Sequence, residues 1–419
     1  MRFLPYISLA ASLCCLVAAP APAGEREVIG KATPKRVVKP TKPLLGKLNS
    51  KTGAVGVGGV KAAGKAAIKK PGKKPKVLNE EPVDKTRILD DLEQYEPPLK
   101  AHVDLLDHRK TKKDLPLLED YKNPCWWQMG KFLCLPYFYI IGFRKCATTD
   151  LFARLNMHPH VVQPWRKETY WISYRKKRLP PSDFADLYGT TIFSKAANNP
   201  DKIIMGDGDP NVAWFFLDSP PKSIVLPAYL IHRYTPAARM IVMMRQPASR
   251  LYSDYLYLQH PDRSPQHFHE NALATMERYT ECFKEDTVRN CVYNRKLFQL
   301  DNKSMIHLSH SMYSIYVAEW LKVFPREQFL FTRTEDFGVK MGEELKKTFK
   351  FLDLHAFEEN EMGILTNMSK ANQNAKSDVG KIMPETEAAL NEFFQPFNEA
   401  LADITGDKKF YWDDLEPRE

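Results

Sequence analysis

One stretch, residues 136–155, constrains the fold of this chain more than any other. Residues 137–141 form an aromatic and β-branched run, which is typical of a buried strand. Gly142 begins a short turn, and Thr148 and Thr149 then favour the start of a helix before a run of apolar residues. A strand, a short loop and a helix N-terminus predict an anion-binding cradle, because free backbone N–H groups and the helix dipole converge on one spot.

The loop between this strand and this helix carries groups that an anion would need. Lys145 adds a full positive charge, and the hydroxyl groups of Thr148 and Thr149 add hydrogen-bond donors. The Gly-x-x-x-x-Gly-Lys-Ser/Thr pattern of Walker loops is absent, which disfavours a P-loop kinase. Taken alone, the loop also fits an ordinary strand–helix connection.

Further apolar runs alternate with helix-like segments along the chain. Strands are expected at residues 161–162, 203–206, 239–245 and 329–332, and helices at residues 247–258, 313–324, 343–352 and 385–401. Pro210, with Asp209 as its cap, is expected to open another helix. Strands that alternate with helices predict the α/β class, with a central parallel sheet flanked by helices.

A second anion-binding candidate follows one of these strands. Residues 239–245 place Arg245 at the carboxyl edge of the sheet, where ligands of open α/β sheets bind. Ser253 lies eight residues later in the helix that Pro247 opens, so it is expected on the same side. A guanidinium group binds two phosphate oxygens at once. The alternative is a surface arginine and a serine that faces water.

The third candidate is the triplet Arg166-Lys167-Glu168, which follows an apolar strand and a proline. A carboxylate beside two cations can be a structural ion pair. It can also be a general base whose charge is stabilised by its neighbours. Both interpretations are open from the residues alone.

The N-terminus predicts entry into the secretory pathway. Arg2 precedes a mostly apolar run at residues 3–19 and a small-residue run at residues 21–24. Residues 1–24 therefore fit a signal peptide cleaved near Ala23, or an uncleaved signal anchor.

The remaining chain is expected to have three parts. Residues 25–79 form a basic stem: the segment from Lys31 to Lys76 holds 14 Lys or Arg and no acidic residue, so the net +10 charge becomes −4 without it. This composition predicts a disordered, solvated linker, with contact to a polyanionic glycan as the alternative; nucleic acid is disfavoured behind a secretory signal. Residues 80–124 are expected to be a charged, weakly helical lead-in, and residues 125–419 the compact domain.

Cysteine spacing agrees with an oxidising compartment. Two pairs are each nine residues apart, and we expect the disulfides Cys125–Cys134 and Cys282–Cys291, with Cys146 free in the loop. Free buried thiols are the alternative. The sequence contains no Cys-x-x-Cys and no clustered His pattern, so it does not predict a metal site. Two Asn-x-Ser sequons, at Asn302 and Asn367, are candidate glycosylation sites.

Taken in this order, the three candidates resemble the motifs of the Golgi carbohydrate sulfotransferases. In that family an Arg-Lys-x-x-Thr-Thr loop binds the 5′-phosphosulfate of 3′-phosphoadenosine 5′-phosphosulfate (PAPS). A later Arg-x-Pro-x-x-Arg-x-x-Ser-Asp-Tyr motif binds its 3′-phosphate. Here the loop positions are Arg144, Lys145, Cys146, Ala147, Thr148 and Thr149, with Ala147 where the family usually has glycine. The later motif is matched by Arg245, Pro247, Arg250, Ser253, Asp254 and Tyr255.

The resemblance, which covers roughly residues 125–412, implies a P-loop-like sulfotransferase fold with PAPS as co-substrate and without a metal. It implies that Glu168 accepts the proton of a sugar hydroxyl and that Lys167 is the other member of the catalytic pair. Lys145 would stabilise charge on the leaving nucleotide. Arg245 and Ser253 would bind the 3′-phosphate.

Within this family, the chain is similar to the branch that sulfates O6 of N-acetylgalactosamine 4-sulfate in chondroitin or dermatan sulfate. The segments that carry this similarity are residues 145–152, 250–257, 313–324 and 383–401. The implied partner is a sulfated glycosaminoglycan in the Golgi lumen, and we expect Arg166, Arg175 and Asp207 to contact it. A heparan sulfate sulfotransferase is the first alternative, disfavoured by Asp207-Gly-Asp-Pro210 in place of Glu-Lys-Ser/Thr-Pro. The second is an inactive glycan-binding protein on the same scaffold.

Overall fold

The computed structural model describes residues 83–96, 115–164, 166–173, 182, 185, 191–196, 199–216, 226–258, 261–371 and 379–414. The expected N-terminal segment 1–24 and stem 25–79 lie outside these residues. Within the described ranges, no helix is both long enough and apolar enough to cross a membrane.

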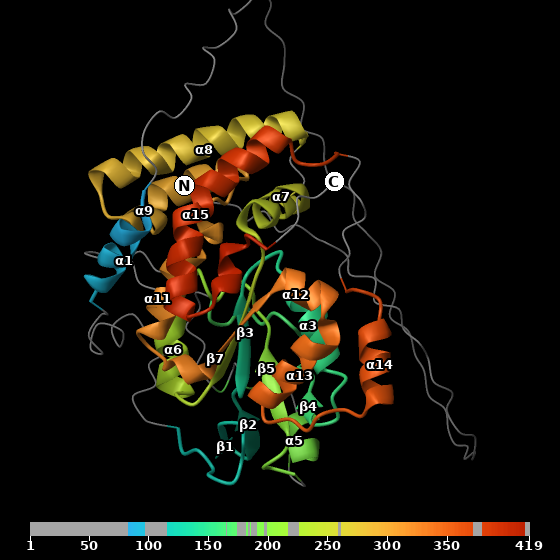
Figure 1. Ribbon diagram of the computed structural model, residues 1–419. Helices are drawn as coiled ribbons and strands as arrows, with labels where there is room; N and C mark the ends of the chain where they lie inside the picture. Colours follow the sequence, from blue (N-terminus) through green and yellow to red (C-terminus); the bar gives the residue numbers. More distant parts are fainter. Residues whose placement is uncertain are drawn as a thin grey trace, which may run out of the picture. The chain divides into compact units, whose positions relative to one another are not determined.

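A five-stranded sheet forms the centre of the fold (Figure 1). All its paired strands are parallel, in the order β4-β5-β3-β6-β7. The strands are β3 (Phe138–Gly142), β4 (Val161–Val162), β5 (Ile204–Asp207), β6 (Arg239–Met244) and β7 (Phe329–Arg333). The predicted α/β class is therefore confirmed, and each of these strands lies within one residue or so of its predicted position.

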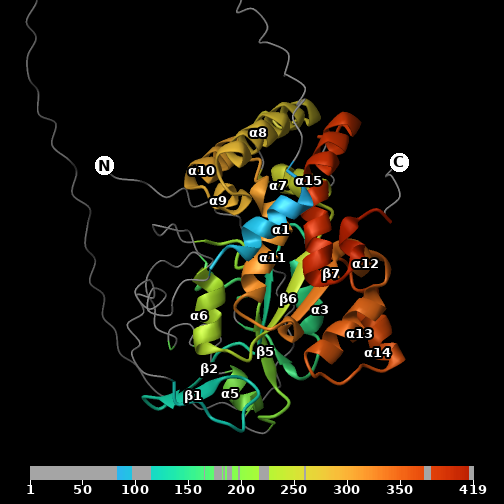
Figure 2. The ribbon, with the colours of Figure 1, turned by 60° about the vertical axis from the view of Figure 1, so that its left-hand side comes forward.

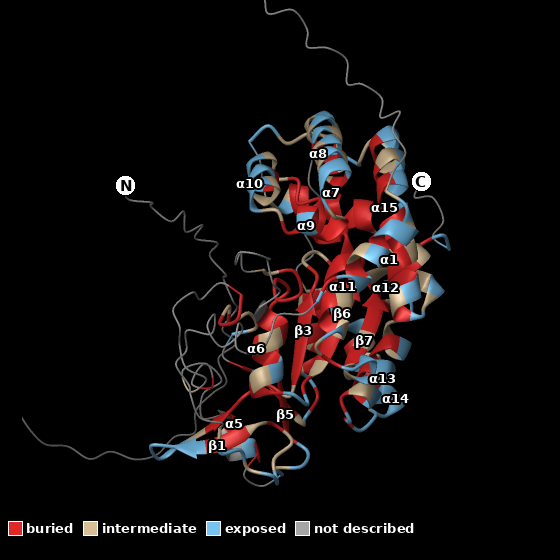
Figure 3. Ribbon diagram, turned by 90° about the vertical axis from the view of Figure 1, so that its left-hand side faces the viewer, coloured by how far each residue is buried: buried red, intermediate tan, exposed pale blue. Residues whose placement is uncertain are grey.

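Helices cover both faces of the sheet (Figures 1 and 2). One face carries α6 (Leu226–Tyr234) and α11 (Tyr313–Leu321), and the other carries α3 (Thr148–Leu155), α13 (Met341–Phe351) and α14 (Glu359–Asn367). With both faces covered, the strands can be apolar throughout. All five residues of β3 are buried, as are the last five of β6 (Figure 3).

The two ends of the sheet differ. Beyond the carboxyl ends of the strands lies a group of helices (Figures 1 and 2): α7 (Pro247–Leu258), α8 (Pro265–Glu285), α9 (Val288–Val292), α10 (Arg295–Ser304) and α15 (Pro384–Thr405). The opposite end carries α5 (Thr191–Ala196) and a hairpin of β1 (Cys125–Gln128) and β2 (Lys131–Cys134). Short elements complete the described chain: α12 (Thr334–Val339), η1 (Ser309–Ser311), η2 (Arg326–Gln328) and η3 (Lys408–Tyr411).

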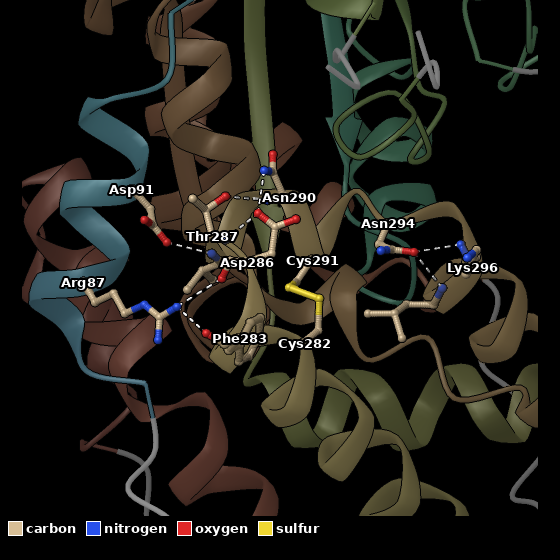
Figure 4. The surroundings of a disulfide bond; sticks show 12 residues. Arg87, Asp91, Cys282, Phe283, Asp286, Thr287, Asn290, Cys291, Asn294 and Lys296 are labelled. Carbon is tan, nitrogen blue, oxygen red and sulfur yellow. Dashed lines mark hydrogen bonds between the residues drawn. A yellow bond between two sulfur atoms is a disulfide. The ribbon is translucent and has the colours of Figure 1, made fainter. Parts of the chain in front are cut away.

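Helix α1 (Lys85–Glu93), which falls in the expected lead-in, packs into the same body. Ile88 and Leu92 are buried on its inner face. Figure 4 shows its polar contacts with the α8–α9 corner: Arg87 Nη2 donates to the Asp286 carbonyl at 3.0 Å, and Asp91 Oδ2 accepts from the Val288 amide at 2.7 Å. The packed core therefore includes residues that precede Cys125.

Both expected disulfides are present. Cys125–Cys134 joins β1 to β2, and Cys282–Cys291 joins the last turn of α8 to α9 (Figure 4). Cys146 is free and buried. The two sequon asparagines, Asn302 and Asn367, are exposed on α10 and α14.

The expected helix after Pro210 is wrong. Residues 210–214 form turns, and the Asp209 carboxylate accepts from both the backbone and the side chain of Asn211 at 3.0 and 2.8 Å. The Ala213 amide donates to the Ile141 carbonyl at 2.7 Å, which keeps this turn against the end of β3. This hydrogen bond to β3 therefore outweighs the local sequence signal for the start of a helix.

Gly206 lies where β5 packs closely against β3. A Cβ atom on Gly206 would lie 2.2 Å from Cζ of Phe138, its register partner. We predict that Gly206→Ala lowers the free energy of unfolding by about 1–3 kcal/mol through overpacking. Urea unfolding measures this loss, and adding Phe138→Leu should recover part of it.

Gly363→Ala in α14 is the matched control, because nothing lies within 4 Å of the added Cβ. It should be neutral or raise stability by up to about 1 kcal/mol through helix propensity. Equal stability of wild type and Gly206→Ala would contradict the packing described for β3 and β5.

Candidate active site

The β3–α3 loop exposes backbone donors where the helix begins. Lys145 and Ala147 adopt left-handed φ angles of 65° and 60°, and α3 starts at Thr148. Among the described residues, nothing accepts a hydrogen bond from the amides of Thr148 and Thr149. The positive end of the α3 dipole and these two free amides form a site for an anion. The left-handed φ at Ala147 also explains why glycine suits this position.

Three cationic side chains, Lys145, Arg144 and Arg245, lie near one another at this loop. Burial lowers the pKa of Lys145; Asp254 opposes the shift, while the charges of Arg144 and Arg245 add to it. The Lys145 Nζ atom lies 4.2 Å from the ring centroid of Tyr257. A bound anion would relieve the repulsion among these cations, so the loop is electrostatically prepared for one.

The second phosphate candidate lies beside the first. Arg245 directly follows β6, the strand that pairs with β3, and Ser253 is half-buried on α7. The buried hydroxyl of Tyr313 donates to the Arg245 carbonyl at 2.9 Å and lies 3.9 Å from Cys146 Sγ. Tyr313 therefore joins the two loops. Burial raises the pKa of Cys146 to about 12, so this thiol is neutral.

A buried carboxylate on α7 contacts cations from both sides. Asp254 is 0% exposed, and it lies 3.3 Å from Arg144 Nη2, 3.4 Å from Arg250 Nη1 and 2.9 Å from His307 Nδ1. Burial alone would raise the pKa of Asp254, but Arg144, His307 and Arg250 outweigh it and hold the pKa well below its usual range. Asp254 thus fixes the loop arginine to the helix that carries Ser253.

Two groups of described side chains are close enough together for a metal, but neither suits one. Asp254 with His307 and His310 already has two guanidinium groups beside the carboxylate. In the other group, both ring nitrogens of His158 contact backbone atoms, of His160 and His355. We assign a metal to neither.

Glu168 lies on a segment that forms hydrogen bonds with Gly208, just after β5. The Lys167 ammonium donates to Glu168 Oε1 at 2.8 Å and to the Gly208 carbonyl at 2.7 Å, while the Gly208 amide donates to the Lys167 carbonyl at 3.0 Å. The Tyr170 hydroxyl donates to the other carboxylate oxygen of Glu168. Because β5 and β3 are neighbours, Glu168 and the β3–α3 loop lie at the same edge of the sheet.

Asp207, expected to contact an acceptor, is 3% exposed. Its carboxylate accepts from the Thr169 hydroxyl at 2.6 Å and from the Asp209 amide at 3.0 Å. These contacts place Asp207 behind the Lys167–Glu168 segment, where it supports that segment. Arg166 is exposed on the same segment, whereas Arg175 lies outside the described residues.

Sequence reasoning did not assign roles to three residues that contact the site. Asp254 was only a motif position, Tyr170 was not considered as a partner of Glu168, and Tyr257 was not considered as a partner of Lys145. The one available signal was spacing: Tyr257 follows Ser253 by four residues, which puts both on one face of a helix.

Asp254 gives a stability prediction. Asp254→Asn should lower the free energy of unfolding at pH 7 by about 3–5 kcal/mol, because it leaves buried cations unpaired. The wild-type advantage should be complete above about pH 5, where the unfolded carboxyl is almost fully ionised. It should shrink as pH falls below that value, since the folded pKa is depressed. Urea unfolding of both proteins at pH 7, 5 and 3.5 measures this.

Asp353→Asn is the control, because Asp353 pairs with Arg239 at 2.6 Å but is 54% exposed. An exposed pair of this kind should contribute less than about 1 kcal/mol. If Asp254→Asn cost no more than Asp353→Asn at pH 7, Asp254 would not be the buried anchor described here.

Ala147 gives a second prediction. A left-handed φ destabilises an alanine in the folded protein by about 1–2 kcal/mol, and glycine avoids this cost. Glycine also has more conformational entropy in the unfolded chain, which offsets part of the gain. Ala147→Gly should therefore raise the free energy of unfolding by up to about 1 kcal/mol, as measured by urea unfolding. Gly406→Ala, at a φ of 69° with nothing within 4 Å of the added Cβ, should lose a similar amount. Loss of stability in Ala147→Gly would disprove the conformational explanation.

Comparisons with known proteins identify the family of this chain. Residues 136–396 match the family model of the sulfotransferase domain. The chain is 34% identical to carbohydrate sulfotransferase 15 of Mus musculus and 33% identical to that of Homo sapiens, each over 313 residues that cover 67% of this chain and 55% of the relative. It is 24% identical to heparan sulfate glucosamine 3-O-sulfotransferase 5 of Homo sapiens over 296 residues, covering 65% of this chain and 72% of that protein.

A solved sulfotransferase from Alicyclobacillus acidocaldarius aligns with a TM-score of 0.43 and 20% identity, over 65% of this chain and 96% of that one. The chain spans about half the length of the carbohydrate sulfotransferase 15 proteins that it matches. The family match at residues 136–396 includes the β3–α3 loop, Glu168, Arg245 and Ser253. This chain therefore belongs to the sulfotransferase domain family.

Proposed function

We propose that this chain transfers a sulfuryl group from PAPS to a hydroxyl of a sulfated glycosaminoglycan. The proposed acceptor position is O6 of N-acetylgalactosamine 4-sulfate in chondroitin or dermatan sulfate. One observation carries the proposal: two cationic sites lie at the ends of the paired strands β3 and β6 and are joined through Asp254. PAPS carries phosphate at both its 5′ and 3′ ends, so it needs two such sites.

The residues of the two sites fit this co-substrate. The free amides and hydroxyls of Thr148 and Thr149, with Lys145 and Arg144, suit the 5′-phosphosulfate. Arg245 and Ser253 suit the 3′-phosphate. That second site distinguishes PAPS from an adenine nucleotide phosphorylated only at its 5′ end.

The chemistry follows from the side chains at this edge. The acceptor hydroxyl oxygen forms a bond to sulfur while the bond from sulfur to the bridging phosphate oxygen breaks. Glu168 takes the hydroxyl proton, and Lys145 stabilises the negative charge that develops on the bridging oxygen as 3′-phosphoadenosine 5′-phosphate (PAP) leaves. Lys167 and Tyr170 orient the two carboxylate oxygens of Glu168.

Two observations support the proposed acceptor. The named relatives with 33–34% identity are carbohydrate sulfotransferases, and Arg166 offers an exposed cation beside Glu168. A heparan sulfate acceptor is the alternative, supported by the more distant 3-O-sulfotransferase relative. The two disulfides suit an oxidising lumen, and we propose the Golgi as its location.

Transfer of labelled sulfate from PAPS to a panel of chondroitin, dermatan and heparan chains tests the proposal. Disaccharide analysis of the products should show sulfate on O6 of 4-sulfated N-acetylgalactosamine. Label on heparan chains alone would overturn the acceptor assignment. Absence of transfer to every chain, together with absence of PAP binding, would overturn the proposed reaction.

Two substitutions test the residue roles. Glu168→Gln should bind PAP with nearly unchanged affinity in calorimetry and lose turnover, because the amide cannot accept the proton. Lys145→Ala should reduce kcat by about 10²–10³-fold, the scale seen on losing one stabiliser of developing charge. Glu359→Gln, in the first turn of α14, is the control and should leave kcat unchanged. Substantial turnover by Glu168→Gln would refute the base assignment.

A further inference from the structure

Tyr257 is an exposed aromatic residue beside the proposed reacting groups. It lies in the last turn of α7 and is 55% exposed, whereas Asp254 and Tyr255 in the same turn are buried at 0%. The buried face of α7 therefore packs against the domain and holds in place the helix that carries Tyr257. The exposed ring is presented by a rigid element at the carboxyl edge of the sheet.

The Tyr257 ring contacts cations of the β3–α3 loop. Lys145 Nζ lies 4.2 Å from its centroid, and the Arg144 guanidinium carbon lies 6.0 Å from it. The electron-rich face of an aromatic ring attracts such cations, but weakly at an exposed site. A charge-assisted contact with a phosphate oxygen is stronger, so an anion in the β3–α3 loop would draw Lys145 away from the ring.

We propose that Tyr257 binds the acceptor sugar and that its ring becomes more available for this once PAPS has engaged Lys145. The inference rests on the proposed function. It adds a residue that determines acceptor affinity, and it predicts an order of binding in which PAPS comes before the acceptor.

The chemistry of the ring suits a sugar of a sulfated chain. A pyranose presents a face of C–H bonds, whose partial positive charge is attracted to an electron-rich aromatic face. The phenol hydroxyl adds a donor and an acceptor for sugar hydroxyl or sulfate oxygens. The neighbouring Arg144 and Lys145 provide the positive surroundings that a polyanionic acceptor needs.

The test uses steady-state kinetics of the full chain with PAPS and a chondroitin 4-sulfate hexasaccharide. Tyr257→Leu should raise the acceptor KM by about 3- to 10-fold, the range that corresponds to loss of one aromatic contact. The KM for PAPS should stay within about 2-fold. Tyr257→Phe keeps the ring but loses the hydroxyl, so its acceptor KM should lie between those of wild type and Tyr257→Leu. Tyr257→Gln is a second ring-free variant and should behave like Tyr257→Leu.

Trp127→Leu is the matched control, because Trp127 is an aromatic residue of similar exposure, 52%, on the hairpin at the opposite end of the sheet. It should leave the acceptor KM unchanged. Calorimetric titration of the hexasaccharide tests the binding order: affinity should be at least about 3-fold higher with saturating PAP than without it.

An unchanged acceptor KM in both ring-free variants, or equal acceptor affinity with and without PAP, would overturn the role of Tyr257. Failure of the proposed function has a different signature, since the wild-type chain would then neither bind PAP nor transfer sulfate. PAP binding by Tyr257→Leu also shows that this variant is folded.

Discussion

The buried carboxylate of Asp254 is the interaction on which the arrangement of this site depends. It lies on α7, which carries Ser253, and it contacts Arg144 of the β3–α3 loop and Arg250 of its own helix. Two segments about 100 residues apart in sequence are thereby set side by side. Its pKa is depressed because its cationic partners outweigh the cost of burial. Asp254 thus connects the β3–α3 loop to α7, and Tyr313 adds a second connection between this loop and Arg245.

The charge balance of the site also explains why it favours an anion. One buried carboxylate, Asp254, lies against the two guanidinium groups of Arg144 and Arg250, and Lys145 lies on the same loop as Arg144. The free amides at the start of α3 add partial positive charge. Glu168 lies apart from this cluster, held by Lys167 and Tyr170 at the end of β5. The residues that we propose for anion binding and for proton removal therefore lie at the ends of neighbouring strands.

The sequence was sufficient for the strands because the signals there are local. Apolar runs identified β3, β5, β6 and β7. Motif spacing singled out Lys145, Arg245 and Glu168 as site residues, and their roles stay predictions. The contacts of Asp254 with His307 and of Tyr313 with Arg245 join segments more than 50 residues apart, so no local pattern indicates them. The turn after Pro210 and the burial of Asp207 also depend on tertiary packing. The left-handed backbone of Ala147 became visible only in three dimensions.

The central claim is that two phosphate sites joined by Asp254 bind one nucleotide with phosphates at both ends. A crystal structure of the full chain with PAP tests it most directly. We expect the 5′-phosphate to accept hydrogen bonds from the amides of Thr148 and Thr149. We also expect the 3′-phosphate to pair with Arg245 and Ser253. A structure in which the 3′-phosphate lies away from Arg245, or in which PAP occupies another surface, would contradict the account.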